Sequence, residues 1–214
     1  MRGRLITLEG IEGAGKSTCA AALCAGLTEA GIPLLRTREP GGTPVGEAVR
    51  ELLLRNEDEP MQGLTELILM FAARAEHIAT VIRPALDAGT WVVCDRFTDA
   101  SRAYQGAGRD LSAAVEQLVA VVHPDLSPDL TLLLDLPVDL GLARAAVRSA
   151  SDRFEAEGAA FMQRVRDGYL ALAAAEPTRF AVIDAAASES EVAAAAFAVL
   201  DARLGPLDAL GRST

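Results

Sequence analysis

The stretch that decides the fold is Gly10-Ile11-Glu12-Gly13-Ala14-Gly15-Lys16-Ser17, in which four residues separate the first glycine from Gly-Lys-Ser. It fits the phosphate-loop pattern, whose glycines let backbone N–H groups wrap around phosphate oxygens at the positive end of a helix. An apolar run, Leu5–Glu9, precedes the loop, and an alanine- and leucine-rich run, residues 18–27, follows it. This strand, loop and helix order favours a phosphate site over an ordinary glycine-rich turn.

Two side chains of the loop have defined chemistry in such a site. Lys16 is expected to reach the outer phosphates as a point charge, and the Ser17 hydroxyl to bind the magnesium ion that bridges them. Trp91–Asp95 is an apolar run that ends in an acid, which is typical of a buried parallel strand that delivers a carboxylate to the ligand edge. We therefore expect Asp95 to share the magnesium with Ser17, although a capping role is the alternative.

Apolar runs alternate with helical periodicity along the chain and predict an α/β fold, a three-layer P-loop NTPase architecture with a five-stranded parallel sheet. The expected strands are Leu5–Glu9, Leu34–Arg38, Trp91–Asp95, Leu130–Asp135 and Phe180–Asp184. The expected helices are residues 18–27, 45–55, 61–86, 111–122, a segment from Pro137 to Arg148, 161–175 and 191–204. Right-handed crossovers place the strands' carboxyl ends at one edge. We expect one domain over residues 1–204 and a flexible tail over 205–214.

Polar stretches follow two of the expected strands. Residues 39–44, Glu-Pro-Gly-Gly-Thr-Pro, form a stiff loop at the edge where ligands bind, with a purely structural turn as the alternative. Residues 97–110 are too rich in hydrogen-bonding groups for a simple connector and are read as a recognition segment. Phe71 and Arg74 share one helix face, although a phenylalanine in such a stripe is usually core. A second pocket is therefore expected opposite the phosphate loop.

Composition excludes several classes of protein. The 214 residues carry a formal net charge of −10, which argues against a protein that coats nucleic acid or an anionic membrane. The three cysteines show no metal-ligand spacing and read as reduced core thiols. His77 and His123 are interpreted as helix-face and surface or capping residues without a catalytic partner. Without a long apolar run or a signal peptide, we expect a cytoplasmic protein.

Three arginines surround a short polar break near residue 150. Arg144, Arg148 and Arg153 flank Ser149-Ala150-Ser151-Asp152. Such a segment, about residues 144–157, is suited to close over a nucleotide as a lid, whereas a solvated helix end is the alternative. Lys16, magnesium and arginines would suffice for phosphoryl transfer, which requires mainly positioning and cations around the moving charge.

The sequence resembles the thymidylate kinases from Leu5 to about Ala185. The resemblance rests on the phosphate loop and on the stretches at residues 37–43, 71–74, 95–97, 101–106 and 152–155. It implies transfer of the γ-phosphoryl group of ATP to dTMP, with Mg²⁺ as cofactor, a nucleoside-monophosphate kinase fold with a lid, and a homodimer formed through long helices. The loop holds no arginine, which is similar to the bacterial type, in which the lid supplies it.

The resemblance also implies residue roles. Phe71 would stack on thymine, Arg74 would bind the base, Arg96 would take the dTMP phosphate, and Tyr104 would crowd out a 2′-hydroxyl. The implied dTMP-binding residues are Glu12, Glu39, Pro40, Phe71, Arg74, Arg96, Ser101, Tyr104 and Gln105. The implied ATP-binding residues are Gly10, Ile11, Glu12, Gly13, Ala14, Gly15, Lys16, Ser17, Thr18, Arg144 near the adenine, and Arg148. The implied catalytic residues are Lys16, Arg153, Arg96 and Glu12. Ala146 stands where relatives often carry another arginine.

Two rival functions stay open at this point. One is a related kinase that acts on another nucleoside monophosphate or on a deoxynucleoside. The other is an ATPase or switch module that transfers phosphate only to water. Arg96 and Arg74 favour an acceptor that already carries a phosphate.

Overall fold

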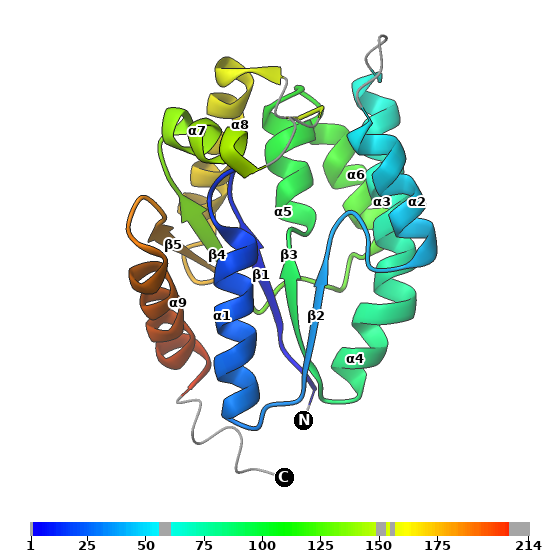
Figure 1. The fold of residues 1–214 in the computed structure, drawn as a ribbon. Coiled ribbons are helices and arrows are strands. Elements are labelled where there is room, and N and C mark those ends of the chain that lie inside the picture. The colour runs from blue at the N-terminus through cyan, green and yellow to red at the C-terminus, as the bar shows by residue number, and fades with distance from the viewer. Residues whose placement is uncertain (1, 56–60, 149–152, 155–156, 206–214) are drawn as a thin grey trace.

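The computed structural model describes residues 2–55, 61–148, 153–154 and 157–205, apart from the side chain of Arg148. Its sheet has five parallel strands in the order β2-β3-β1-β4-β5 (Figure 1). They are β1 (Leu5–Glu9), β2 (Leu34–Arg38), β3 (Trp91–Asp95), β4 (Leu130–Asp135) and β5 (Phe180–Asp184). The three central strands are almost wholly buried because their residues are apolar on both faces. The predicted fold class and strands are confirmed.

Strand register brings the predicted ligand edge together. Leu8 of β1 pairs with Asp95 of β3 on one side and with Leu132 of β4 on the other. The loop that follows β1 therefore emerges beside the acid that ends β3. This is the edge at which open α/β sheets bind ligands.

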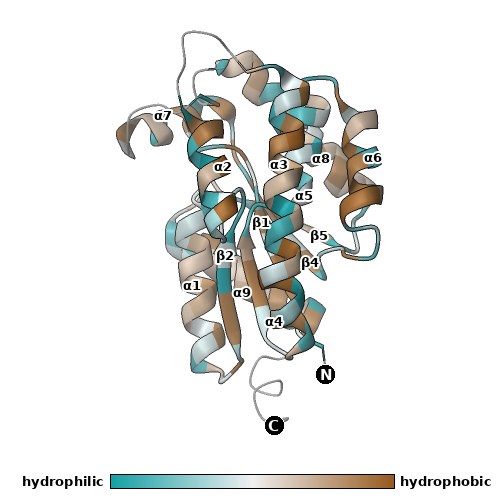
Figure 2. Ribbon diagram, turned by 90° about the vertical axis from the view of Figure 1, so that its right-hand side faces the viewer, coloured by the Kyte–Doolittle hydropathy of each residue, from teal (hydrophilic) through white to brown (hydrophobic). Residues whose placement is uncertain are grey.

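Helices cover both faces of the sheet. Helix α1 (Lys16–Glu29) packs on β1, β2 and β3, and α9 (Glu189–Leu204) packs beside it on β5. The opposite face carries α4 (Arg83–Asp87), on β3, and α8 (Ala159–Ala175), on β4 and β5. Figure 2 shows the resulting layers, with α1 on one side of the sheet and α3, α4, α5 and α8 on the other. The two outer layers enclose the apolar core.

The remaining helices surround the ligand edge. They are α2 (Pro44–Leu54), α3 (Gly63–His77), α5 (Thr98–Ser101), α6 (Ser112–Val122) and α7 (Val138–Arg148). Residues 149–152 and 155–156 of the predicted lid, and residues 206–214 of the predicted tail, lie outside the described residues. Within the described part of the chain, no helix has the length and apolar character needed to cross a membrane.

The single helix expected over residues 61–86 is interrupted by a π-helical turn. Helix α3 is followed by π-helix η1 (Ile78–Ile82) and then by α4. The Arg83 N–H reaches back to the Ile78 carbonyl, which is the wider spacing of a π turn. Pro84 lacks an N–H, so the regular ladder cannot continue through it, and the wider turn lies directly before this position.

The recognition segment is helical, which the sequence analysis missed. Residues 97–110 contain α5 and a second π-helix, η2 (Arg102–Ala107). The sequence analysis assigned no secondary structure to this segment, in which Gly106 and Gly108 have poor helix propensity. The helical backbone places Ser101, Tyr104 and Gln105 on one face, because they are three and four residues apart.

Candidate active site

The phosphate loop wraps tightly between β1 and α1. Gly10, Gly13 and Gly15 have φ angles of 138°, 75° and 81°, a region that favours glycine. A Cβ on Gly13 would lie 2.0 Å from the Gly141 carbonyl oxygen of α7, so a side chain is excluded there. Lys16 opens α1, and its Nζ donates to the carbonyls of Gly10 (3.1 Å) and Ile11 (2.8 Å). Burial, reinforced by the Arg96 guanidinium, lowers the pKa of Lys16 to about 8.

The two predicted metal ligands lie together. The Ser17 Oγ donates to Asp95 Oδ2 at 2.9 Å. Hard oxygen donors of this kind suit Mg²⁺, which proteins usually hold through one or two side chains while phosphate and water complete the shell. The described residues contain no cluster of three or more His, Cys, Asp or Glu side chains that would make a metal site built by protein alone. The donor set therefore fits a magnesium ion that arrives with a nucleotide.

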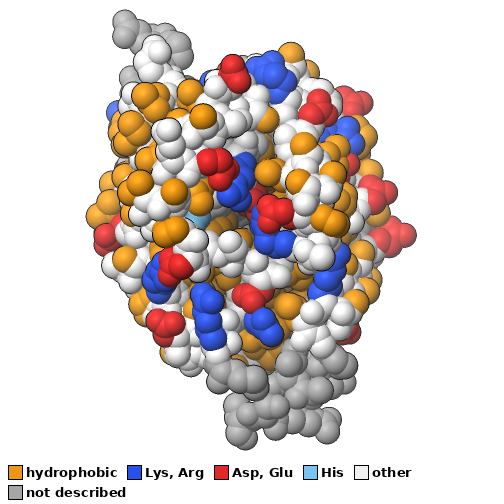
Figure 3. Space-filling view, turned by 180° about the vertical axis from the view of Figure 1, so that it is seen from behind, with side chains coloured by type: hydrophobic (Ala, Val, Ile, Leu, Met, Phe, Trp, Pro, Cys, Tyr) orange, Lys and Arg blue, Asp and Glu red, His pale blue; other side chains and the backbone are white. Residues whose placement is uncertain are grey.

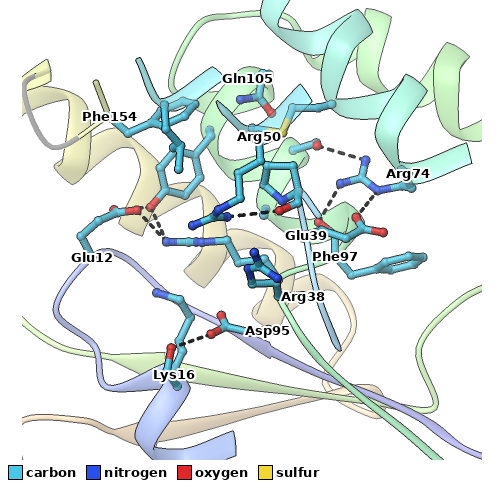
Figure 4. A pocket seen from close by; sticks show the side chains of 18 residues that line it. Glu12, Lys16, Arg38, Glu39, Arg50, Arg74, Asp95, Phe97, Gln105 and Phe154 are labelled. Carbon is cyan, nitrogen blue, oxygen red and sulfur yellow. Dashed lines mark hydrogen bonds and ion pairs between the residues drawn. The ribbon is translucent and has the colours of Figure 1, made fainter. Parts of the chain in front are cut away.

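A cavity extends from the phosphate loop toward α3 and η2 (Figure 4). Its lining includes five basic side chains, Lys16, Arg38, Arg50, Arg74 and Arg96, against three acids, Glu12, Glu39 and Asp95. The protein as a whole carries a charge of −10, so positive charge is concentrated here. This local excess suits a phosphorylated ligand. In contrast, acidic and basic groups are interspersed on the face shown in Figure 3.

Arg96 is the most constrained cation in the cavity. Its φ of 67° is left-handed, a conformation that is uncommon for non-glycine residues and is enriched at functional sites. Nη2 donates to Glu12 Oε1 (2.7 Å) and the Tyr104 hydroxyl (3.1 Å), and Nη1 donates to the Gly10 carbonyl (2.9 Å) and the Tyr169 hydroxyl (3.2 Å). Burial raises the pKa of Glu12, but the charges of Arg96 and Lys16 and the Tyr104 hydrogen bond together outweigh this effect, and the pKa is lowered. The guanidinium is thus fixed before any ligand arrives.

A second buried charge cluster forms the floor of the cavity near α3. Glu39 accepts from Arg74 Nε at 2.7 Å and from His77 Nδ1 at 3.0 Å. Arg74 also donates to the Ser101 hydroxyl (3.1 Å) and the Phe97 carbonyl (3.1 Å). Burial disfavours the charged carboxylate, yet the Arg74 charge and the His77 hydrogen bond lower the pKa of Glu39. These contacts connect three segments that are distant in the sequence, namely the loop after β2, helix α3 and the segment from Phe97 to Ser101.

Most predicted acceptor-site residues meet in this cavity. The lining includes Glu12, Lys16, Ser17, Glu39, Pro40, Arg74, Asp95, Arg96, Ser101, Tyr104 and Gln105. In Figure 4, Gln105 lies at the upper end of the pocket, and Lys16 and Asp95 lie at the lower end. The arrangement provides a phosphate site and a separate polar pocket in one continuous space.

Phe71 is the exception on α3. It does not line the cavity; its ring is 2% exposed and stacks on His123 at 6.3 Å, with the Arg74 guanidinium 4.6 Å from its centroid. Met70, one residue earlier, lines the cavity instead. A shift of one residue turns a side chain by about 100° around a helix, so Phe71 points into the core. In this structure Phe71 supports Arg74 from behind.

The two lid arginines whose side chains are described, Arg144 and Arg153, hydrogen-bond to groups outside the phosphate loop. Arg153 Nη2 pairs with the buried Glu66 at 2.6 Å and its Nε donates to the Leu53 carbonyl, and it is absent from the cavity lining. Arg144 donates to the carbonyls of Ala185 (2.6 Å) and Ala186 (3.2 Å) at the loop after β5. The Arg148 side chain lies outside the described residues. The catalytic role of Arg153 therefore stays a prediction that requires the ion pair with Glu66 to open.

Sequence reasoning missed several cavity residues. Arg38, Arg50, Leu54, Met70, Phe97, Ala100 and Phe154 also line the cavity. Arg38 and Arg50 could have been found from the sequence, because an acidic chain that binds phosphates must gather its few basic residues at the site. Sequence reasoning placed His77 on a helix and offered a cap for His123, and both agree with the structure, where His77 ends α3 and His123 is the C-cap of α6; the burial of the two rings was not foreseen. His123 is buried, not a surface residue; its Nδ1 donates to the Leu126 carbonyl and Nε2 lies 2.9 Å from the Thr98 hydroxyl. His77 is also buried, against Glu39 and Thr37.

Taken together, a parallel sheet with a phosphate loop after its first strand, and a second cationic pocket facing that loop, define a P-loop kinase of the nucleoside-monophosphate kinase type. The family model for thymidylate kinase matches residues 8–196. A thymidylate kinase of Pseudomonas fluorescens is 58% identical over 193 residues, which cover 90% of this chain and 92% of the relative. The chain belongs to the thymidylate kinase family.

Other relatives agree with this assignment. A thymidylate kinase of Methylobacillus flagellatus is 57% identical over 185 residues, covering 86% of this chain and 90% of that protein. The crystal structure of thymidylate kinase from Ehrlichia chaffeensis matches with a TM-score of 0.76 and 32% sequence identity. That match covers 94% of this chain and 100% of the solved chain.

Proposed function

We propose that this chain transfers the γ-phosphoryl group of ATP to the phosphate of dTMP, giving dTDP and ADP. The observation that carries the proposal is the single cavity in which a phosphate loop faces the polar group of Arg74, Ser101 and Gln105. In an in-line transfer, an oxygen of the acceptor phosphate bonds to the γ-phosphorus while the bond to the β,γ-bridging oxygen breaks and ADP leaves. The two ligands must therefore meet end to end.

Each group of residues has a role in this reaction. The backbone N–H groups of residues 10–18 bind the ATP phosphates, and Lys16 turns from its two carbonyl partners to the outer phosphates. Ser17 and Asp95 hold Mg²⁺, which supplies charge neutralisation on the phosphates when it is bound. Arg96 binds the acceptor phosphate, with Glu12 and the Tyr104 hydroxyl fixing its orientation.

The acceptor base is assigned to the upper part of the pocket. Arg74 uses three of its five N–H groups on Glu39, Ser101 and Phe97, which leaves two for a base carbonyl. Met70, rather than Phe71, supplies the apolar contact from α3 at the cavity wall. Burial raises the pKa of the Tyr104 hydroxyl well above its usual range, so this group stays protonated beside the sugar position.

Arg153 is assigned to the transition state. Its guanidinium would leave Glu66 when the lid closes and would stabilise charge on the transferred group, with Arg148 in support and Arg144 beside the adenine. The phosphate loop supplies Lys16 but no arginine, so an arginine that joins Lys16 at the moving phosphoryl group must come from elsewhere in the chain.

The direct test is ADP formation with a panel of acceptors, namely dTMP, dUMP, UMP and dCMP, and a reaction without acceptor. We expect the highest kcat/KM for dTMP and negligible ADP without acceptor. Equal rates for dTMP and UMP would point to another nucleotide kinase. Turnover without acceptor at the same rate would point to an ATPase.

We also propose that the protein forms a homodimer through α3 and α6 and works in the cytoplasm. Leu64 and Ile68 on α3 and Val121 on α6 are 52%, 51% and 79% exposed. Figure 3 shows apolar groups gathered toward its left side, where these helices lie. Cys19, Cys24 and Cys94 are free thiols, which suits a reducing compartment. Sedimentation of the wild type and of Ile68→Glu tests this proposal. We expect the wild type to sediment as a dimer and the variant to shift toward monomer.

A further inference from the structure

A buried carboxylate links the base pocket to the lid. Glu66 of α3 is 0% exposed and accepts three side-chain donors. Oε1 accepts from Gln105 Nε2 (2.7 Å) and Arg109 Nε (2.9 Å), and Oε2 accepts from Arg153 Nη2 (2.6 Å). The reaction outlined above gives Glu66 no role except as the ion-pair partner of Arg153 before the lid closes. A buried acid with this many partners sets the orientation of the groups that surround it.

The orientation of the Gln105 side chain follows from this contact. A carboxylate that pairs with two guanidinium groups acts only as a hydrogen-bond acceptor, whereas a side-chain amide has a donor end and an acceptor end. The NH₂ group of Gln105 must therefore point to Glu66. Its carbonyl oxygen, Oε1, is left on the opposite side of the amide.

That carbonyl oxygen faces the cavity. Gln105 lines the pocket, and its Oε1 accepts no hydrogen bond from the described residues. In the described part of the chain, every side-chain nitrogen or oxygen that is fully enclosed has a hydrogen-bond partner. Because Oε1 has no such partner, it is not fully enclosed, and it is accessible from the cavity. The polar end of the pocket thus presents a bare acceptor, beside the remaining donors of Arg74.

An acceptor at this point distinguishes pyrimidine bases. Thymine and uracil carry an N–H at N3, which donates to a carbonyl oxygen. Cytosine has a lone pair at N3, which would face the oxygen of Gln105 without a hydrogen bond. Arg74 adds donors that suit a carbonyl at position 4 rather than the amino group of cytosine.

We propose that Glu66 is a positioning residue that sets base specificity: by taking the amide N–H of Gln105, it fixes the amide carbonyl toward the ligand and so selects pyrimidine nucleotides with an N–H at N3. This inference rests on the proposed function and extends it to a residue that does not line the cavity. Arg109 and Arg153 also pair with this carboxylate in the ligand-free structure, but the proposal requires only its contact with Gln105. Arg109 in turn lies 5.0 Å over the Phe161 ring, which anchors it to α8.

The test compares the wild type with Glu66→Gln. A glutamine at position 66 can accept from or donate to Gln105, so the amide of Gln105 is no longer fixed. We expect the preference for dTMP over dCMP to fall roughly tenfold to a hundredfold. This preference is measured as kcat/KM for dTMP relative to the affinity for dCMP as an inhibitor. The preference for dTMP over dUMP should not change, because both bases carry the N3 hydrogen. A general loss of folding would instead lower kcat/KM for all acceptors by the same factor.

Two further variants separate positioning from packing. In the exchange variant Glu66→Gln/Gln105→Glu, the amide at position 66 donates to the new carboxylate, whose second oxygen again presents an acceptor to the ligand. We expect this variant to regain discrimination against dCMP. Arg109→Gln removes one ion pair of Glu66 without touching Gln105, so its base preference should match the wild type. An unchanged dTMP/dCMP ratio in folded Glu66→Gln would overturn the proposal.

The wild-type protein provides a test that does not depend on any variant folding. Calorimetry with dTMP methylated at N3 removes the donor from the base. We expect affinity to fall at least tenfold relative to dTMP, and equal affinity would refute the acceptor at Gln105. If the wild type does not bind dTMP at all, the proposed function fails. If it binds dTMP but ignores the N3 methyl group, only the inference about Glu66 and Gln105 fails.

Discussion

Replacing Glu39 by glutamine tests how strongly the buried charge cluster supports the fold. The side chains of Glu39 and Arg74 are 4% and 2% exposed, and their ion pair measures 2.7 Å. Removing one partner of a buried pair leaves an uncompensated charge and destabilises a protein by about 3–5 kcal/mol. Glutamine still accepts one hydrogen bond from Arg74, so we expect a loss near 3 kcal/mol. For a chain of this size that corresponds to a fall in Tm of about 6–12 °C.

Urea unfolding of the ligand-free protein at pH 7 measures this loss. The matched control is Glu116→Gln, which breaks an ion pair with Arg102 whose side chains are 23% and 56% exposed. We expect a change of only about 0–1 kcal/mol there. In the double variant Glu39→Gln/Arg74→Met no unpaired charge remains, so the loss should be smaller than the sum of the single losses. A loss for Glu39→Gln no larger than that of the control would refute the reasoning.

The same variant carries a pH signature. The pKa of Glu39 is lower in the folded protein than its ordinary value of 4.5: burial raises it, but the charges and hydrogen bonds of Arg74 and His77 together lower it by more. The carboxylate therefore stabilises the fold above its unfolded pKa, and this contribution is lost as the pH falls through the folded pKa. The stability difference between wild type and Glu39→Gln should be full at neutral pH and should close below pH 4.5. A gap that widens on acidification would contradict the assignment.

Three predictions concern the reaction. Arg153→Ala should lower kcat by about 10²–10³-fold while the Kd for dTMP changes little, and equal losses in both would place Arg153 outside the transition state. The pKa of Lys16 is lowered to about 8 by burial, and bound phosphate should raise it again, so ATP binding should take up a proton and weaken above pH 8. Calorimetry at pH 7 and 9 in two buffers measures this proton uptake. If ATP binding took up no proton at pH 9, the prediction for Lys16 would be wrong. Ser17→Ala should raise the Mg²⁺ concentration needed for half-maximal activity, and an unchanged requirement would remove Ser17 from the metal site.

The sheet could be predicted because each strand is recognisable from its own short stretch of sequence. A parallel strand buried on both faces reads as a continuous apolar run, and each of the five runs became a strand with the expected bounds. The phosphate loop was equally readable, because its glycines and Lys16 have a fixed spacing. The break in the long helix was less readable, since the effect of Pro84 depends on how the preceding turn adjusts.

The acceptor pocket could be predicted only in part. Ser101, Tyr104 and Gln105 were found from composition, although their helical backbone was not. Phe71 was misplaced because neighbouring helix positions differ by about 100°, and only packing decides whether Met70 or Phe71 meets the cavity. Glu66 gave no signal, because its role depends on three partners that lie 39, 43 and 87 residues away in the chain.

The occupied guanidinium of Arg96 has a consequence for turnover. An anion that reaches this group finds it already neutralised by Glu12 and held by two tyrosine hydroxyls. Because Glu12 stays paired with Arg96, its negative charge offsets part of the attraction between the guanidinium and a phosphate bound there. This offset weakens the binding of product as well as of acceptor and so favours product release after each turnover.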